Sequence, residues 1–277
     1  MNLIRRHFKR YNPDLSVNDI NENTLQGFVE YLIYTKKLRN TTAEKHFSFL
    51  VWFLRWATDH GYIKSNAHNA FKPKFKGINT KEVIYLTWEE LTYLFDYDFK
   101  EKKYLERVRD VFCFCCFTGL RYSDARKLSK EDVFKGYIEI VTQKTTDRLK
   151  IELNDYSKAI LSKYEDDPLL GHKALPVISN QKMNKYLKEM GKLVGFDTPI
   201  KIVYFKGNRR FEEVKPKHEL LATHCGRRTF VVNALYLGIP AEVIMRWTGH
   251  SDYKSMKPYV KIVDDLKASE MSKFNRK

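Results

Sequence analysis

Long apolar runs are missing from this 277-residue sequence, and none approaches the roughly 18 uninterrupted apolar residues that a membrane-spanning helix needs. The opening residues, MNLIRRHFKRYNPDLS, do not have the pattern of a signal peptide. A Walker-type glycine loop, clustered carboxylates, internal repeats and low-complexity tracts are missing as well. These absences predict a protein without a membrane partner that acts in the cytoplasm.

Cysteine is scarce, with four residues in the whole chain. Three of them, Cys113, Cys115 and Cys116, alternate with phenylalanines, which predicts buried thiols that act as small hydrophobes. No C-x-x-C pair has matching histidines, so we expect neither a structural zinc site nor a disulfide framework. This usage is typical of a reducing, intracellular setting.

The charge balance is strongly basic. Lys and Arg number 50 against 34 Asp and Glu, which gives a net charge of +16 and a sequence pI near 9.5. Such an excess points to a polyanionic partner, most commonly nucleic acid, although an ordinary basic surface stays open as the alternative. The length exceeds the usual size of a single domain, and the hydrophobic content of 43% suits packed cores.

The N-terminal region predicts a small helical domain over residues 1–75. Apolar residues recur at helical spacing from Thr41 to His60, and Thr41 with Glu44 predicts a capping box at the start of that helix. An earlier helix is expected from about Thr24, capped by polar residues in Asn21–Asn23. Residues 76–82 contain lysine and glycine without helical or strand periodicity, and predict a linker.

Residues 83–277 predict a second domain that is mainly α with a small β-hairpin. A capping box at Thr87 and Glu90 starts one helix, and Gly119 ends an apolar helix over 108–118. Alternating runs at 137–141 and 149–153 predict a hairpin with a basic tip. Further helices are expected at 182–194, 229–237, 241–247 and, in the tail, 264–273.

Two motifs place arginines where they can bind a phosphate. Arg121 follows the buried helix in Thr118–Asp124, and its planar fork can contact two phosphate oxygens while Asp124 braces the turn. His224 and Arg227 are three residues apart and therefore face the same way on a helix. Each motif alone has an ordinary alternative, a solvated arginine or a structural histidine.

Three further residues complete the candidate site. Lys144 lies at the predicted hairpin tip, His250 follows Gly249, and Tyr259 lies nine positions beyond His250. Taken singly, these residues are typical of a surface lysine and of a tyrosine used for packing. Pro258 restricts the backbone, and predicts that Tyr259 sits on an extended or turn segment.

In this order and spacing the six residues resemble the signature of the tyrosine recombinase (phage integrase) family. That signature is an arginine in TGLR-x-S-[ED], a hairpin lysine, H-x-x-R, a G-H pair and a tyrosine, and the first motif is similar to integrases of Bacteroides-type mobile elements. The resemblance covers the whole chain and implies a DNA-binding domain at 1–75 and a catalytic domain at 83–277. The implied catalytic residues are Arg121, Lys144, His224, Arg227, His250 and Tyr259.

The resemblance implies a site-specific recombinase that cleaves and rejoins double-stranded DNA through a 3′-phosphotyrosine, with no cofactor and no metal. It also implies a bacterial, cytoplasmic homotetramer on DNA that exchanges tail helices around 264–271, a monomer in solution being equally compatible. Two rivals stay open: a type IB topoisomerase, which reseals the same strand, and a catalytically silent DNA-binding accessory protein.

Overall fold

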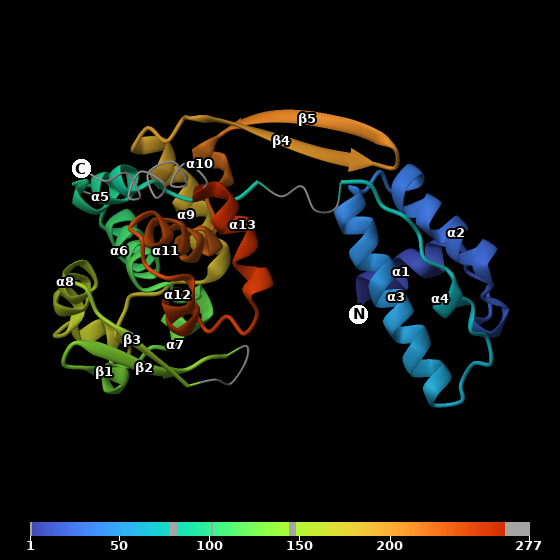
Figure 1. The fold of residues 1–277 in the computed structure, drawn as a ribbon, viewed down its shortest axis with the longest axis horizontal. Coiled ribbons are helices and arrows are strands. Elements are labelled where there is room, and N and C mark those ends of the chain that lie inside the picture. Colours follow the sequence, from blue (N-terminus) through green and yellow to red (C-terminus); the bar gives the residue numbers. More distant parts are fainter. Residues whose placement is uncertain (1, 78–81, 101, 144–147, 264–277) are drawn as a thin grey trace, which may run out of the picture. The chain divides into compact units, whose positions relative to one another are not determined.

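The computed structural model describes residues 2–77, 82–100, 102–143 and 148–263 (Figure 1). The chain divides into two compact units. Unit 1 comprises Met1–Glu82 together with Lys201–Val214, and unit 2 comprises Val83–Ile200 and Lys215–Lys277. The fold is mainly helical with small antiparallel sheets, which confirms the predicted fold class. The predicted second domain included 201–214, and the structure groups that segment with unit 1 instead.

Unit 1 is built on four α-helices: α1 (Asn2–Tyr11), α2 (Glu22–Glu30), α3 (Asn40–Asp59) and α4 (Ala67–Ala70). A π-helical turn, Tyr31–Thr35, follows α2. Because apolar residues recur every three or four positions, α2 and α3 bury one stripe each in a shared core, of which Leu25, Phe28, Leu32, Leu50 and Leu54 are members. The Asn21 side chain caps α2 by accepting from the amide of Thr24, as the sequence predicts.

The predicted capping box at the start of α3 is wrong. The helix begins at Asn40 with Arg39 at the cap position, and no side chain caps it. Thr41 and Glu44 therefore lie inside the helix and not at its boundary. The side chain of Asn40 is used elsewhere, because it bonds to the backbone of Lys76 and Gly207.

Two histidines face each other between α1 and α3. The ring centroids of His7 and His46 are 5.2 Å apart, and in the described part of the chain neither Nδ1 atom has a hydrogen-bond partner. Burial lowers the pKa of both rings, and the charges of His46, Lys36, Arg10 and Arg6 lower the pKa of His7 further. The folded unit therefore favours neutral rings, whereas the unfolded chain binds protons near the ordinary value of 6.5.

We expect unit 1 to lose stability as the pH falls below about 6.5, because the unfolded state then binds more protons than the folded state. Thermal unfolding of the full chain, measured between about pH 5 and pH 8, checks this slope. The His46→Phe variant should show a shallower dependence of stability on pH. His60→Phe, at an exposed histidine that follows the last residue of α3, is the control and should keep the original dependence. An equal slope in both variants would contradict the assignment.

Unit 2 holds the remaining elements, and β4 and β5 continue from it into unit 1. The helices are α5 (Trp88–Asp96), α6 (Lys103–Thr118), α7 (Tyr122–Lys127), α8 (Asp155–Tyr164), α9 (Asn180–Leu193), α10 (Lys217–Leu220), α11 (Thr223–Tyr236), α12 (Ala241–Thr248) and α13 (Lys257–Val260). The strands are β1 (Val133–Phe134), β2 (Tyr137–Val141), β3 (Arg148–Glu152), β4 (Pro199–Lys206) and β5 (Arg209–Pro216).

Helix α6 forms the centre of unit 2 and packs against α5, α8, α9 and α11 (Figure 1). Its second half is buried on all sides, including Cys113, Cys115 and Cys116, and burial raises the pKa of these thiols well above the ordinary range. All four cysteines are free, which agrees with the predicted role as small hydrophobes. The Thr87–Glu90 capping box is present at the start of α5, as predicted.

The predicted hairpin is confirmed and forms two strands of a three-stranded antiparallel sheet, with β1 beside β2. Strand β2 pairs with β3 so that Ile138 faces Ile151 and Ile140 faces Leu149, which buries the apolar face. Strands β4 and β5 form a second sheet that sequence periodicity missed. These two strands have no fully buried position, so the alternation that marks a half-buried strand is missing from them.

In the part of the chain that the structure describes, no helix combines the length and the apolar character that crossing a membrane requires.

Candidate active site

The turn after α6 fixes the place of Arg121. Gly119 ends α6 in the left-handed region with φ 72°, and a Cβ at this position would lie 2.6 Å from the ring of Phe230. Glycine is therefore required both for the backbone conformation and for the close approach of α11. Leu120 is buried, and Arg121 then caps α7 in an extended conformation. A rigid turn thus presents the guanidinium at the edge of the core.

Asp124 connects Arg121 to the end of strand β2. Its side chain is 2% exposed, and Oδ2 lies 3.8 Å from Nη1 of Arg121. Oδ1 accepts a hydrogen bond of 3.0 Å from the backbone amide of Gln143. The bracing role that the sequence suggested for Asp124 therefore reaches the residue before Lys144. Lys144 itself lies outside the described residues.

Arg227 is the most enclosed cation of the site, 3% exposed in the middle of α11. Nη1 donates to the carbonyl of Gly119 at 2.9 Å, and Nη2 donates to the carbonyl of Thr248. Nη2 also lies 3.2 Å from Nε2 of His250. One guanidinium thereby joins the ends of α6 and α12, which are far apart in the sequence.

The electrostatics of Arg227 show which charges surround it. Burial lowers its pKa to about 9, and the charge of Arg121 lowers the pKa as well, while Tyr259 and Asp124 act in the opposite direction. Arg227 therefore remains charged at neutral pH. The two arginines lie close enough to repel each other, an arrangement that a bound anion would relieve.

His250 is oriented by the end of α12. Gly249 ends this helix in the left-handed region with φ 59°, and the Thr248 hydroxyl lies 2.8 Å from Nδ1 of His250. Since Thr248 contacts Arg227 through its carbonyl and His250 through its hydroxyl, it positions both residues. Sequence reasoning missed this role, although Thr248 lies within the W-T-G-H motif that pointed to His250.

Tyr259 lies on a single helical turn, so of the two predicted alternatives the extended segment is wrong and the turn agrees with the structure. Helix α13 spans Lys257–Val260, and the amides of Tyr259 and Val260 both donate to the carbonyl of Met256. Pro258 fits because its missing N–H belongs to the first turn of a helix, where amides have no intrahelical partner. The Tyr259 ring packs on the cluster of Val231, Ala234, Ile244 and Met256.

The structure thus brings Arg121, Arg227, His250 and Tyr259 together. His224 lies three residues before Arg227 in the first turn of α11 and is exposed. In the described part of the chain, Nη1 of Arg121 is buried and has no hydrogen-bond partner. A buried donor that makes no hydrogen bond, with Asp124 Oδ2 at 3.8 Å, can bind an anionic oxygen.

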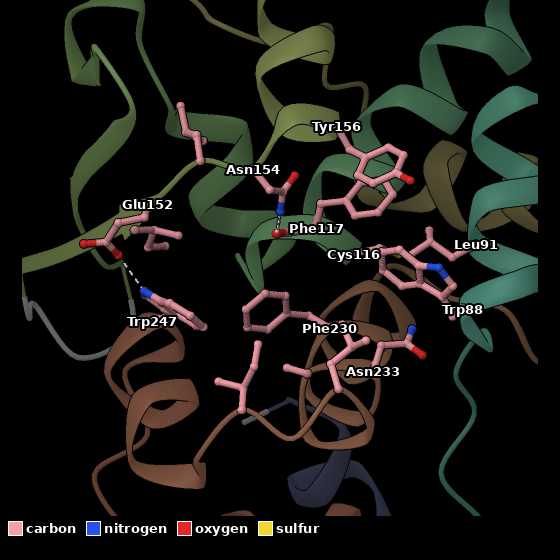
Figure 2. Close-up of a pocket in the computed structure, with 15 residues that line it drawn as sticks. Trp88, Leu91, Cys116, Phe117, Glu152, Asn154, Tyr156, Phe230, Asn233 and Trp247 are labelled. Carbon is pink, nitrogen blue, oxygen red and sulfur yellow. Dashed lines mark hydrogen bonds between the residues drawn. The ribbon is translucent and has the colours of Figure 1, made fainter.

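A separate apolar pocket of about 380 Å³ lies in unit 2 between α5, α11 and strand β3. Figure 2 shows its aromatic walls, among them Trp88, Phe230 and Trp247, and none of the five predicted site residues that the structure describes lines it. At its rim the indole Nε1 of Trp247 donates to a Glu152 carboxylate oxygen at 2.6 Å (Figure 2). This bond holds β3 against α12, and so links the hairpin to the helix that precedes His250.

Comparison with protein families decides the relationship. The family model described as "Phage integrase family" matches residues 85–265, and "Phage integrase SAM-like domain" matches residues 2–76. The chain belongs to the phage integrase family. This integrase family member is a tyrosine recombinase, a site-specific DNA recombination enzyme. No sequence among the curated proteins matches it.

The fold of this integrase is similar to several solved recombinase structures. A lambda integrase (75–356) dimer bound to a COC′ core site aligns with a TM-score of 0.68 and 18% identity, covering 92% of this chain and 85% of that chain. XerH bound to a palindromic difH substrate gives 0.70 and 18%, covering 98% and 77%. The Tn1549 transposon integrase (aa 82–397) with circular intermediate DNA gives 0.64 and 15%, covering 92% and 87%.

Proposed function

We propose that this recombinase cleaves double-stranded DNA with Tyr259 as nucleophile and holds the attacked phosphate between Arg121 and Arg227. The observation that carries the proposal is the pair of neighbouring guanidinium groups, one of which has a buried Nη1 without a hydrogen bond, with Tyr259 packed against α11, the helix that carries the other. A pentacovalent phosphate in the transition state carries extra negative charge, which preorganised cations stabilise more than they stabilise the substrate.

The first step forms a bond between Tyr259 Oη and phosphorus and breaks the bond from phosphorus to the 5′ oxygen. A tyrosine phenol is protonated at neutral pH, so the phenolic proton must leave as the oxygen attacks. His224 accepts that proton, and Lys144 gives one to the departing 5′ oxygen. His250 donates a hydrogen bond to the phosphate. The products are a 3′-phosphotyrosine and a free 5′ hydroxyl.

The second step reverses the first with a hydroxyl from another duplex. The incoming 5′ oxygen attacks the phosphotyrosine, and the phenol of Tyr259 leaves with a proton. Because the covalent link conserves the energy of the phosphodiester, exchange needs no external energy source. The likeness to a lambda integrase tetramer bound to a Holliday junction supports assembly of four copies on DNA for this chain. The tail 264–277, expected to be exchanged between copies, lies outside the described residues.

A recombination assay tests this function against its rivals. The protein is incubated with paired attachment sites taken from the borders of the encoding element, and the products are sequenced across the junctions. Exchanged junctions support the recombinase. Relaxation of supercoiled DNA without exchange would favour a type IB topoisomerase, and binding without any covalent adduct would favour a silent accessory protein.

The role of Lys144 as a proton donor is tested with a DNA substrate that has a different leaving group. We expect Lys144→Ala to slow cleavage of ordinary DNA strongly and to be rescued by a substrate with sulfur in place of the 5′ oxygen, since a thiolate leaves without a proton. The anchoring of Gln143 beside Asp124 supports placing Lys144 near the phosphate. Lys150→Ala, on the exposed side of β3, is the matched control and should cleave both substrates normally. A variant at position 144 that the sulfur substrate does not rescue would assign the lysine to phosphate binding instead.

A further inference from the structure

Segment Lys201–Val214 is part of unit 1 although both its ends continue into unit 2. The segment contains most of strands β4 and β5, which run side by side as one hairpin (Figure 1), with Gly207 and Asn208 at the turn. No residue of the segment belongs to the buried core of unit 1 among the described residues. The hairpin is therefore attached to a finished helical unit and is not needed to complete its core.

The turn of the hairpin docks on the first residue of α3. The Asn40 side chain is 2% exposed, and its Oδ1 accepts from the amide of Gly207 at 2.7 Å. Its Nδ2 donates to the carbonyl of Gly207 at 2.8 Å and to the carbonyl of Lys76 at 3.0 Å. The amide thus pairs with both backbone groups of one residue, as a neighbouring strand would. A short hydrophobic or charged side chain cannot reproduce this pairing.

Contacts on either side extend the dock. The Arg39 guanidinium lies 3.7 Å from the centroid of the Tyr204 ring, and its Nη2 lies 3.1 Å from a carboxylate oxygen of Glu213. A Cβ on Gly77 would lie 2.2 Å from the Phe205 ring, so the backbone at Gly77 fits closely against the hairpin. Ring contacts and an ion pair therefore flank the pairing of Asn40 with Gly207.

We propose that Lys201–Val214 is a strap that docks on unit 1 and slows the release of DNA. The inference rests on the proposed function and adds that both units, each of which is basic, contact the same duplex. The two units are joined by the chain at 76–82, and the docked strap adds a second link. A second link raises the effective concentration of one unit near its site while the other stays bound, which prolongs the lifetime of the complex without a new contact to DNA.

The test measures how fast a labelled random-sequence duplex leaves the full-length protein after a chase with excess unlabelled duplex. Two variants remove the dock from opposite sides: Asn40→Ala, and a chain in which an Asn-Gly turn replaces residues 204–211. We expect each variant to release DNA about tenfold faster, in line with the loss of a pair of buried hydrogen bonds. Asn208→Ala, at the exposed neighbour of Gly207, is the matched control and should release DNA at the original rate.

Combining the two variants distinguishes the strap from a folding defect at α3. If both act through the dock, the combined chain releases DNA no faster than either alone. Additive effects, or an unchanged release rate in the shortened chain, would overturn the proposal. Covalent adduct formation at saturating DNA is measured in parallel and should be the same in all these chains. Absence of the adduct in the unaltered protein would count against the proposed function. The release rates would still decide the strap proposal, because release is measured without cleavage.

Discussion

We expect Tyr259→Phe to abolish covalent protein–DNA adducts while DNA binding changes little. The substitution removes one oxygen, and the remaining ring keeps its packing on Val231, Ala234, Ile244 and Met256. Because no bond to phosphorus can form without that oxygen, the loss of cleavage should be complete within detection. The measurement is denaturing electrophoresis of the protein with a nicked duplex that traps the phosphotyrosine.

A matched control separates this loss from a general effect of removing a hydroxyl. Tyr253→Phe alters an exposed tyrosine in the 3₁₀ turn that precedes α13, and adducts should form at the original rate. Mass spectrometry of the trapped peptide should place the nucleotide on position 259. An adduct that survives Tyr259→Phe would assign the nucleophile to another residue.

Arg121→Ala should slow adduct formation by about 10²–10³-fold at saturating DNA. The guanidinium is 19% exposed, and in the described part of the chain its buried Nη1 atom donates no hydrogen bond and has only the longer ion pair of 3.8 Å with Asp124. Removing it costs the folded protein little, whereas the transition state loses a preorganised cation. The checks are the single-turnover cleavage rate and the melting temperature of the same preparation.

Arg227→Ala provides the contrast, because Arg227 holds the carbonyls of Gly119 and Thr248 as well as His250. We expect this variant to lose both the cleavage rate and thermal stability. Arg126→Ala changes an exposed residue of α7, the helix that follows Arg121, and is the control. It should keep both the cleavage rate and the thermal stability. Equal losses of stability at positions 121 and 227 would contradict the distinction between an arginine that mainly binds the phosphate and one that also holds the fold together.

Local patterns predicted many of the elements. The Thr87–Glu90 box starts α5, Gly119 ends α6, and the alternating runs form β2 and β3. These features depend on neighbours within a few positions, where backbone conformation and side-chain spacing dominate. Where a distant partner competes, local rules fail. Asn40 bonds to Gly207 and Lys76, so the start of α3 lies one residue before the predicted box.

The candidate site shows the same division. Its residue types and spacing could be predicted from the sequence, because binding a phosphate, accepting a proton and acting as nucleophile each need particular side chains. The supporting contacts could not be predicted from the sequence: Arg227 on the carbonyl of Gly119, Asp124 on the amide of Gln143, and Glu152 on Trp247 join segments from different parts of the chain. No periodicity encodes such pairs.

By itself, the sequence determined the helical character, the basic charge and the set of chemical groups, because each follows from composition or from short-range spacing. Only the tertiary structure decided that Arg227 closes the ends of α6 and α12 into one site, and that Lys201–Val214 leaves the catalytic unit to join the N-terminal helices. The physical reason is that these arrangements are selected by contacts between residues more than a hundred positions apart, such as Arg227 with Gly119 and Asn40 with Gly207.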